Sequence, residues 1–178
     1  MKATTRIAKR RGYVAITKVD SGLAPRPGMK REFNEATRDS YAETAFWFHD
    51  EKTPNRFTKS HAEQAGYGKR KGENLPRGSR AYRRSYTGRK ERVKGHTRPM
   101  VLSGDTERDV TRSRPSVTAS KNGAILRYPK ARKLNYRHPK SRLRPSEEFG
   151  RITSQEATEA GTQQDKHLQA ELDRRDQD

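Results

Sequence analysis

The chain has 178 residues, of which 28% are hydrophobic and 35% charged, and its formal net charge is +19. The hydrophobic fraction is well below that of an ordinary globular protein, so the composition predicts a small core and excludes one built from the whole chain. The sequence has no cysteine, which excludes disulfides and thiolate metal sites. No apolar run approaches the roughly 20 residues of a membrane-spanning helix, so we expect no membrane partner.

The charge is divided unevenly along the chain. Residues 147–178 hold nine acidic and four basic side chains, for a formal charge of −5, so residues 1–146 carry +24. A body this basic is normally neutralised by a polyanion or by acidic neighbours. The uneven distribution suits head-to-tail contacts between identical subunits, or an acidic tail that shields a basic body.

The N-terminal third contains a predicted arm, strand and helix. Residues 1–29 are expected to contain a basic arm, residues 1–11, and a first strand, residues 12–19. The strand residues are rich in β-branched and aromatic side chains. A Gly- and Pro-containing loop follows, and residues 30–49 contain neither residue type. Apolar and Thr side chains recur there at three-to-four spacing, which predicts a helix with a core-facing stripe. The candidate core residues of this helix are Phe33, Tyr41, Trp47 and Phe48.

A dense basic segment follows a short helix predicted at residues 58–66, with Thr58 or Ser60 as its N-cap. Residues 69–98 hold twelve Lys or Arg side chains and two Glu, for a formal charge of +10, and only two aliphatic side chains. We expect that this segment does not bury itself. Residues 80–86 and 89–94 are each too short for a stable isolated helix, so helix is expected there on contact with a partner.

The cations of this segment are the candidate functional residues, because a phosphate backbone attracts Lys and Arg regardless of base sequence. Tyr82 and Tyr86 are candidates for stacking on exposed bases. Two other interpretations stay open: ion pairs with acidic neighbours in a protein ring, and a simply solvated face. The candidate contacts with a polyanion or a neighbouring subunit are Lys69, Arg70, Lys71, Arg77, Arg80, Arg83, Arg84, Arg89, Lys90 and Arg92.

The remaining sequence predicts a hairpin and a C-terminal helix. Residues 99–104 are an apolar island that we expect to dock onto the core, and residues 105–113 are compatible with either helix or strand. The hairpin spans residues 115–128, with Asn122-Gly123 at its turn because this dipeptide tolerates positive φ. Residues 129–145 are expected to be a basic loop.

The last segment, residues 153–178, is predicted to be an acidic helix that opens at a Thr-Ser-Gln-Glu capping box. Its apolar stripe is thin, so we expect this helix to pack weakly or to project. Residues 30–152 would then form the body. The expected fold class is α+β: a small antiparallel sheet with packed helices, long basic loops or arms, and a polar C-terminal helix.

No constellation of catalytic residues is recognisable. The five His residues are scattered without the helical spacing of a metal site, and no Gly-rich phosphate loop of the GxxxxGK[ST] type is present. No Ser stands in a nucleophile elbow. We therefore expect a protein that is not an enzyme and that uses no cofactor and no metal.

The order of several short motifs resembles a family of bacteriophage virion-morphogenesis proteins, the tail-completion or head–tail joining proteins of long-tailed phages. The resemblance covers roughly residues 41–176, and Arg56 stands where the family pattern has His. The matching motifs are Trp47-Phe48-His49, Pro54, Phe57-Thr58, Ala65-Gly66-Tyr67-Gly68, Arg70, Tyr86, Lys90 and Pro99-Met100-Val101-Leu102-Ser103-Gly104.

The resemblance implies a non-enzymatic structural subunit of the virion that forms a ring at the head–tail connector or at the tail end. It implies core anchors at Trp47, Phe57, Tyr67, Val101 and Leu102, and makes residues 69–98 an arm that reaches a neighbouring ring or the portal. The expected partners are copies of the same chain, other neck, portal or tail proteins and, through non-specific contact, the packaged DNA. Deleting residues 69–98 is expected to spare folding and abolish assembly.

Two alternatives from other classes stay open. The first is a basic RNA-binding component of a ribosome or another ribonucleoprotein, which the small size and the Gly-punctuated basic loops also fit. The second is a small DNA-binding factor, although no helix-turn-helix or zinc module is visible.

Overall fold

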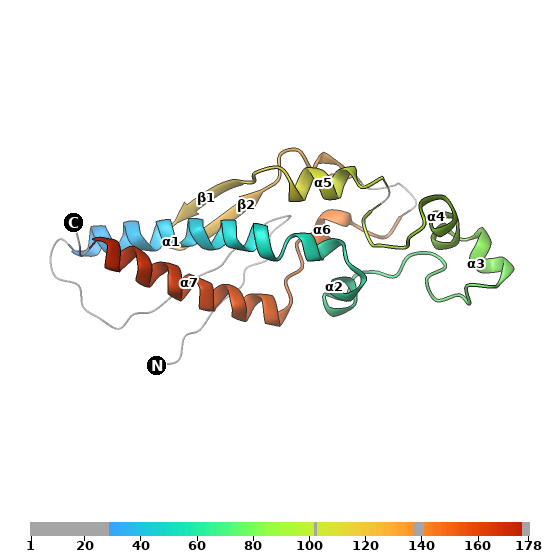
Figure 1. The fold of residues 1–178 in the computed structure, drawn as a ribbon, viewed down its shortest axis with the longest axis horizontal. Helices are drawn as coiled ribbons and strands as arrows, with labels where there is room; N and C mark the ends of the chain where they lie inside the picture. Colours follow the sequence, from blue (N-terminus) through green and yellow to red (C-terminus); the bar gives the residue numbers. More distant parts are fainter. Residues whose placement is uncertain (1–28, 102, 137–140, 176–178) are drawn as a thin grey trace.

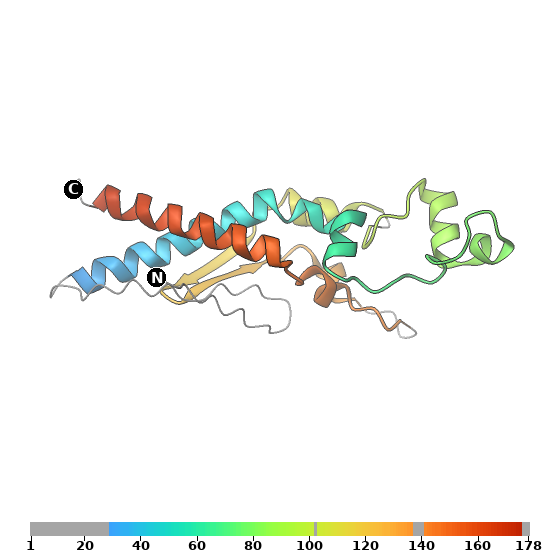
Figure 2. The same ribbon diagram turned by 90° about the horizontal axis from the view of Figure 1, so that it is seen from below.

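The computed structural model describes residues 29–101, 103–136 and 141–175. This part of the chain has the α+β fold that the sequence predicts, with seven α-helices, two short 3-10 helices and one two-stranded antiparallel sheet. The molecule is elongated: the two longest helices and the sheet occupy one end, and two short helices occupy the other (Figures 1 and 2). The predicted basic arm and the predicted strand at residues 12–19 lie outside the described residues.

The two long helices, α1 (Met29–Glu51) and α7 (Ser154–Arg175), lie side by side and antiparallel (Figure 1). Helix α1 confirms the prediction for residues 30–49. The capping box of α7 is also confirmed: the Glu156 amide donates to the Thr153 hydroxyl at 3.2 Å, and the Thr153 amide donates to the Glu156 carboxylate at 2.9 Å. The start of α7 is therefore set by a local sequence signal.

The expectation that α7 packs weakly or projects was wrong: α7 packs along α1. Much of this contact is polar, which a thin apolar stripe does not reveal. Gln164 is 2% exposed. Its side-chain amide donates to the Ser40 hydroxyl at 2.7 Å and accepts from the Thr44 hydroxyl at 2.9 Å. Near the end of α7, Arg175 pairs with Asp39 at 2.9 Å. Buried hydrogen bonds thus hold the helix where apolar side chains are few.

The predicted hairpin is confirmed as β1 (Ser116–Ser120) and β2 (Gly123–Arg127), with Ser116 opposite Arg127 and Ser120 opposite Gly123. Its turn is one residue earlier than predicted. Lys121 and Asn122 form the two-residue loop, and neither has a positive φ, since Met100 is the only such non-glycine among the described residues. Gly123 instead takes φ +148°, which a glycine adopts without steric cost.

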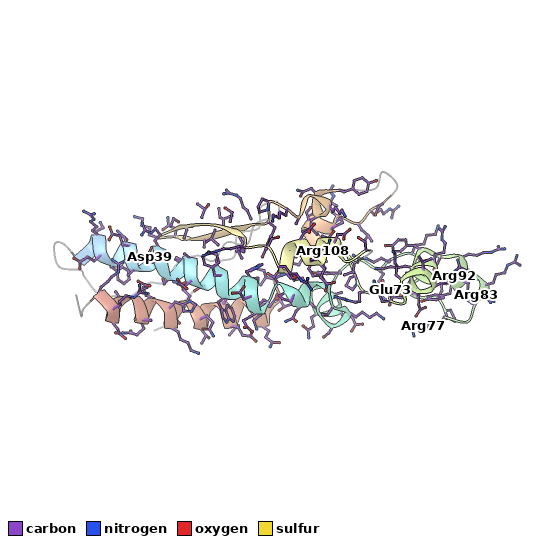
Figure 3. The ribbon with its side chains drawn as sticks, turned by 45° about the horizontal axis from the view of Figure 1, so that its top comes forward. Asp39, Glu73, Arg77, Arg83, Arg92 and Arg108 are labelled. Atoms are coloured by element: carbon purple, nitrogen blue, oxygen red, sulfur yellow. The ribbon has the colours of Figure 1, made fainter. Side chains whose placement is uncertain are left out.

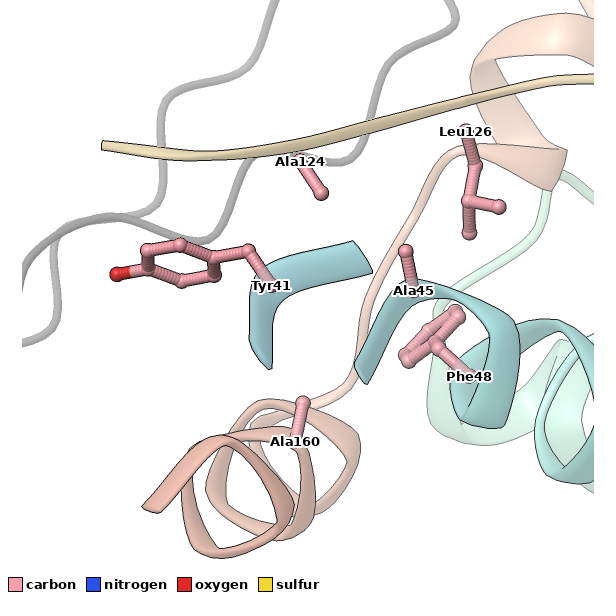
Figure 4. Close-up of a cluster of buried hydrophobic side chains, with 6 residues drawn as sticks. All are labelled: Tyr41, Ala45, Phe48, Ala124, Leu126 and Ala160. Atoms are coloured by element: carbon pink, nitrogen blue, oxygen red, sulfur yellow. The ribbon is translucent and has the colours of Figure 1, made fainter. Parts of the chain in front are cut away.

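The first core cluster lies between α1, the sheet and α7. Tyr41, Ala45 and Phe48 from α1 meet Ala124 and Leu126 from β2 and Ala160 from α7 (Figure 4). Trp47 is partly buried against this cluster, and Phe33 is partly buried near the start of α1.

A second cluster joins the short elements beyond the helix pair. These are a 3-10 helix at Pro54–Phe57, α5 (Asp105–Thr111), a second 3-10 helix at Arg132–Asn135 and α6 (Pro145–Phe149). The short helix α2 (Lys59–Gln64) follows the first 3-10 helix and contributes no residue to this cluster. The buried members are Phe57, Val101, Val110, Ala131 and Leu134. The island at residues 99–104 therefore docks through Val101 as expected, whereas Leu102 lies outside the described residues.

Residues 105–113 were compatible with helix or strand from the sequence, and the structure shows a helix there, α5. The predicted anchors Tyr41, Phe48, Phe57, Tyr67 and Val101 are all buried. In the described ranges, no helix combines the length and the apolar character that crossing a membrane requires.

Candidate functional site

Residues 69–98 form a separate end of the molecule, which we call the basic lobe. It contains α3 (Arg80–Arg84) and α4 (Tyr86–Lys94), which pack on each other (Figure 1). The expectation that the segment does not bury itself was wrong, because Tyr82, Ser85 and Thr87 are buried within the chain itself.

Serine N-caps stabilise α3 and α4, although both helices are short. The Ser79 hydroxyl accepts from the Tyr82 amide at 3.0 Å, and the Ser85 hydroxyl accepts from the Gly88 amide at 3.1 Å while it donates to the Tyr82 carbonyl at 2.7 Å. Ser85 thus ends α3 and begins α4. Each cap satisfies a backbone donor that the first turn of a helix leaves free.

Gly88 brings the two helices together. A Cβ added there would lie 2.1 Å from the Tyr82 carbonyl oxygen, so only glycine permits this approach. The lobe is therefore held by caps and close backbone packing rather than by an apolar core, which explains why its composition predicted no folded unit.

Tyr82 faces inward. Its hydroxyl donates to Glu91 at 2.5 Å, and this hydrogen bond to the carboxylate raises the pKa of Tyr82. Arg77 lies 3.5 Å from the other oxygen of the same carboxylate. Tyr82 is consequently not available to stack on bases, contrary to expectation, whereas Tyr86 is 45% exposed.

Two ion pairs fasten the lobe to the body, one at each end of the segment. Arg70 binds the buried carboxylate of Glu148 on α6 through two nitrogens, at 2.5 and 3.1 Å, and the Gly68 amide donates to the same carboxylate at 2.8 Å. At the other end Arg98 pairs with Glu107 on α5. The lobe is therefore anchored to the body where the chain leaves it and where it returns.

Lys90 is buried between these two attachments. It is 7% exposed, donates to the Arg98 carbonyl, and lies 6.0 Å from the centre of the Tyr86 ring. Burial, with Arg70 and Arg98 as further causes, lowers the pKa of Lys90 to about 8. Arg70 and Lys90, which the sequence placed among the candidate contacts, thus hold the fold instead of facing a partner.

Apart from Arg98, the remaining lobe cations are exposed. Figure 3 shows Arg83 and Arg92 at the end of the molecule farthest from the helix pair. Eight exposed cations of the lobe have no hydrogen bond or ion pair from their side chains to another described residue. They are Lys69, Lys71, Arg80, Arg83, Arg84, Arg89, Arg92 and Lys94.

A groove of about 540 Å³ separates the lobe from α2. Its walls carry both signs of charge, with Lys59, Lys69 and Arg77 facing a space that Glu63 and Glu73 also line. The mixed charge makes it a poor match for a polyanion. The unpaired cations, of which only Lys69 lines the groove, therefore define the stronger candidate surface.

A buried polar cluster joins α7 to the segment after α1. Arg56, only 1% exposed, donates to the Phe149 carbonyl at 2.7 Å and lies 3.3 Å from Glu156. His61 stands 3.6 Å from the same carboxylate. Burial lowers the pKa of His61 despite Glu156, and burial raises the pKa of Tyr67, the neighbouring ring, to about 12.

The roles of Arg56 and Glu148 were not predicted from the sequence. The departure from the family pattern at Arg56 was visible, but its burial was not, and nothing local distinguishes Glu148 from its neighbour Glu147. Within the described residues, no group of three or more His, Cys, Asp or Glu side chains is placed to hold a metal ion.

Comparison of this chain with protein-family models, with curated protein sequences and with solved structures finds no match.

Proposed function

We propose that this protein is a structural subunit of a bacteriophage virion that assembles into a ring at the head–tail connector or at the tail end. The order of motifs along residues 41–176 supports the class of protein. The observation that carries the proposal is the projecting lobe, in which eight exposed cations have no partner in the described chain.

An elongated subunit of this kind suits a ring. The α1–α7 pair and the sheet hold the fold through internal contacts, so they serve as the rigid part. The lobe, fastened by Arg70 and Arg98, projects from that part and presents its charge beyond it. A projecting basic surface is stabilised by acidic neighbours or by a polyanion.

The oligomeric state of the purified full-length chain tests the proposal. Native mass spectrometry and light scattering are expected to show a closed oligomer of fixed stoichiometry. A chain that stays a compact, sharply melting monomer at micromolar concentration and above would contradict it. Electron microscopy of phage particles should further place the subunit at the neck or the tail end.

The RNA-binding alternative makes a different prediction. A ribonucleoprotein component would copurify with a defined RNA, and RNase treatment would change its oligomeric state. A ring that forms without nucleic acid and is unchanged by RNase would favour the virion subunit over the ribonucleoprotein component.

Deletion of residues 69–98 is a weaker test than the sequence alone suggested. It removes Arg70 and leaves the carboxylate of Glu148 buried without its partner, so failed assembly could reflect failed folding. Substitutions confined to the exposed lobe cations avoid this ambiguity.

A further inference from the structure

The exposed surface of the basic lobe has the chemistry of a phosphate-binding surface. Its eight unpaired cations come from the loop before α3, from α3 and from α4. The two acidic side chains of the lobe offset little of this charge. Glu91 is engaged by Tyr82 and Arg77, and Glu73, which accepts from the Arg70 amide at 2.7 Å, is a single negative charge against eight positive ones.

We propose that the basic lobe binds the phosphate backbone of duplex DNA without reading its sequence. This inference rests on the proposed function for the identity of that DNA as the packaged genome. Duplex DNA carries one negative charge per about 1.7 Å of its axis, a density that an array of guanidinium groups on two adjoining short helices can meet at several points at once.

An acidic protein fits this surface less well. The centre of a protein–protein interface is depleted of Lys, Asp and Glu and is built around aromatic and other apolar side chains, with Arg often beside them. Among the described residues of the lobe, only three large apolar side chains are exposed, those of Leu75, Tyr86 and Val93. No apolar centre is present on the described lobe around which a charged rim could form.

Single-stranded nucleic acid also fits less well. Proteins that bind it combine a basic groove with several aromatic platforms on which bases stack. Tyr82 is buried and hydrogen bonded to Glu91, which leaves Tyr86 as the one exposed aromatic ring of the lobe. Backbone contact is therefore the main interaction that the lobe can offer.

The test compares two variants of the full chain with equal net charge. In the lobe variant, five exposed arginines become Gln: Arg80→Gln, Arg83→Gln, Arg84→Gln, Arg89→Gln and Arg92→Gln. In the body variant, five exposed cations elsewhere become Gln: Lys30→Gln, Arg112→Gln, Lys121→Gln, Lys130→Gln and Lys166→Gln. Binding of a short fluorescent DNA duplex of arbitrary sequence is measured by anisotropy from about 50 to about 200 mM salt.

The wild-type and body-variant chains are expected to bind with a steep salt dependence. If five lobe arginines engage phosphates at once, the slope of log K against log salt is about −4.5, and the lobe variant loses most of that slope. Equal weakening in the two variants would overturn the proposal, because binding would then follow net charge alone. Circular dichroism is expected to show the same helix content in all three proteins.

Two competitor arms identify the partner class. Polyglutamate that competes as well as duplex DNA would overturn the inference in favour of an acidic protein, and tighter binding of single-stranded DNA or of RNA would overturn the duplex assignment. The two proposals can fail independently. A closed ring that does not bind DNA through the lobe would contradict the DNA-binding inference alone. A monomer that binds DNA through the lobe would contradict the ring proposal alone.

Discussion

Glu156 offers the sharpest test of how this fold is held together. Its carboxylate accepts from Arg56 on one side and from the Thr153 amide on the other, so it joins the start of α7 to a cation that is almost fully buried. The substitution Glu156→Gln keeps the shape and one acceptor oxygen but removes the charge that neutralises Arg56.

The magnitude follows from that geometry. Removing one partner of a buried ion pair costs about 3–5 kcal/mol, because the remaining charge stays buried without compensation. Arg56 keeps two backbone acceptors, the carbonyls of Phe149 and Arg151, so we expect a loss near the lower limit, about 3 kcal/mol. A domain typically has about 5–15 kcal/mol of stability, so the loss is a large fraction of the total.

The matched control is Glu159→Gln, three residues further along α7. Glu159 pairs with Lys52, but its side chain is 33% exposed, against 9% for Glu156. A pair that water reaches contributes much less than a buried one, so the control is expected to lose far less stability than Glu156→Gln. Urea unfolding followed by circular dichroism and by the fluorescence of Trp47, the single tryptophan, gives both free energies.

The reasoning is refuted if Glu156→Gln costs less than about 1 kcal/mol or no more than Glu159→Gln. A double-mutant cycle with Arg56→Met adds a second criterion, because the two residues are in contact. The double variant is expected to lose less stability than the sum of the two single variants.

Two further predictions concern the lobe. Gly88→Ala is expected to open the α3–α4 contact, since its Cβ would lie 2.1 Å from the Tyr82 carbonyl oxygen, whereas Gly78→Ala is expected to have little effect because nothing lies within 4 Å of a Cβ there. Hydrogen exchange of the lobe amides measures both, and equal protection in the two variants would contradict the close packing. Lys90→Met tests the buried ammonium: the folded protein holds this proton less tightly than the unfolded chain, where lysine titrates near its ordinary 10.5. The wild type should therefore gain stability relative to Lys90→Met as pH rises from about 8 to about 10.5, measured by chemical denaturation, and a pH-independent difference would be evidence against a lowered pKa.

Local signals in the sequence determined the elements of this protein. The spacing of Tyr41, Ala45 and Phe48 predicts α1, and Thr153 with Glu156 marks the start of α7. The hairpin follows from two short β-prone runs around Gly123. These features depend on residues within one or two turns of each other, so neighbouring positions suffice to identify them.

The pairing of the elements depended on contacts that the linear order conceals. Gln164 appears in a thin apolar stripe, yet its amide meets Ser40 and Thr44, more than 100 positions earlier. The compact lobe likewise depends on the absence of a side chain at Gly88, a close approach that composition does not reveal. Only the tertiary structure decided which cations of residues 69–98 hold the fold and which face outward, because Arg70 and Lys90 differ from their neighbours in surroundings and not in residue type.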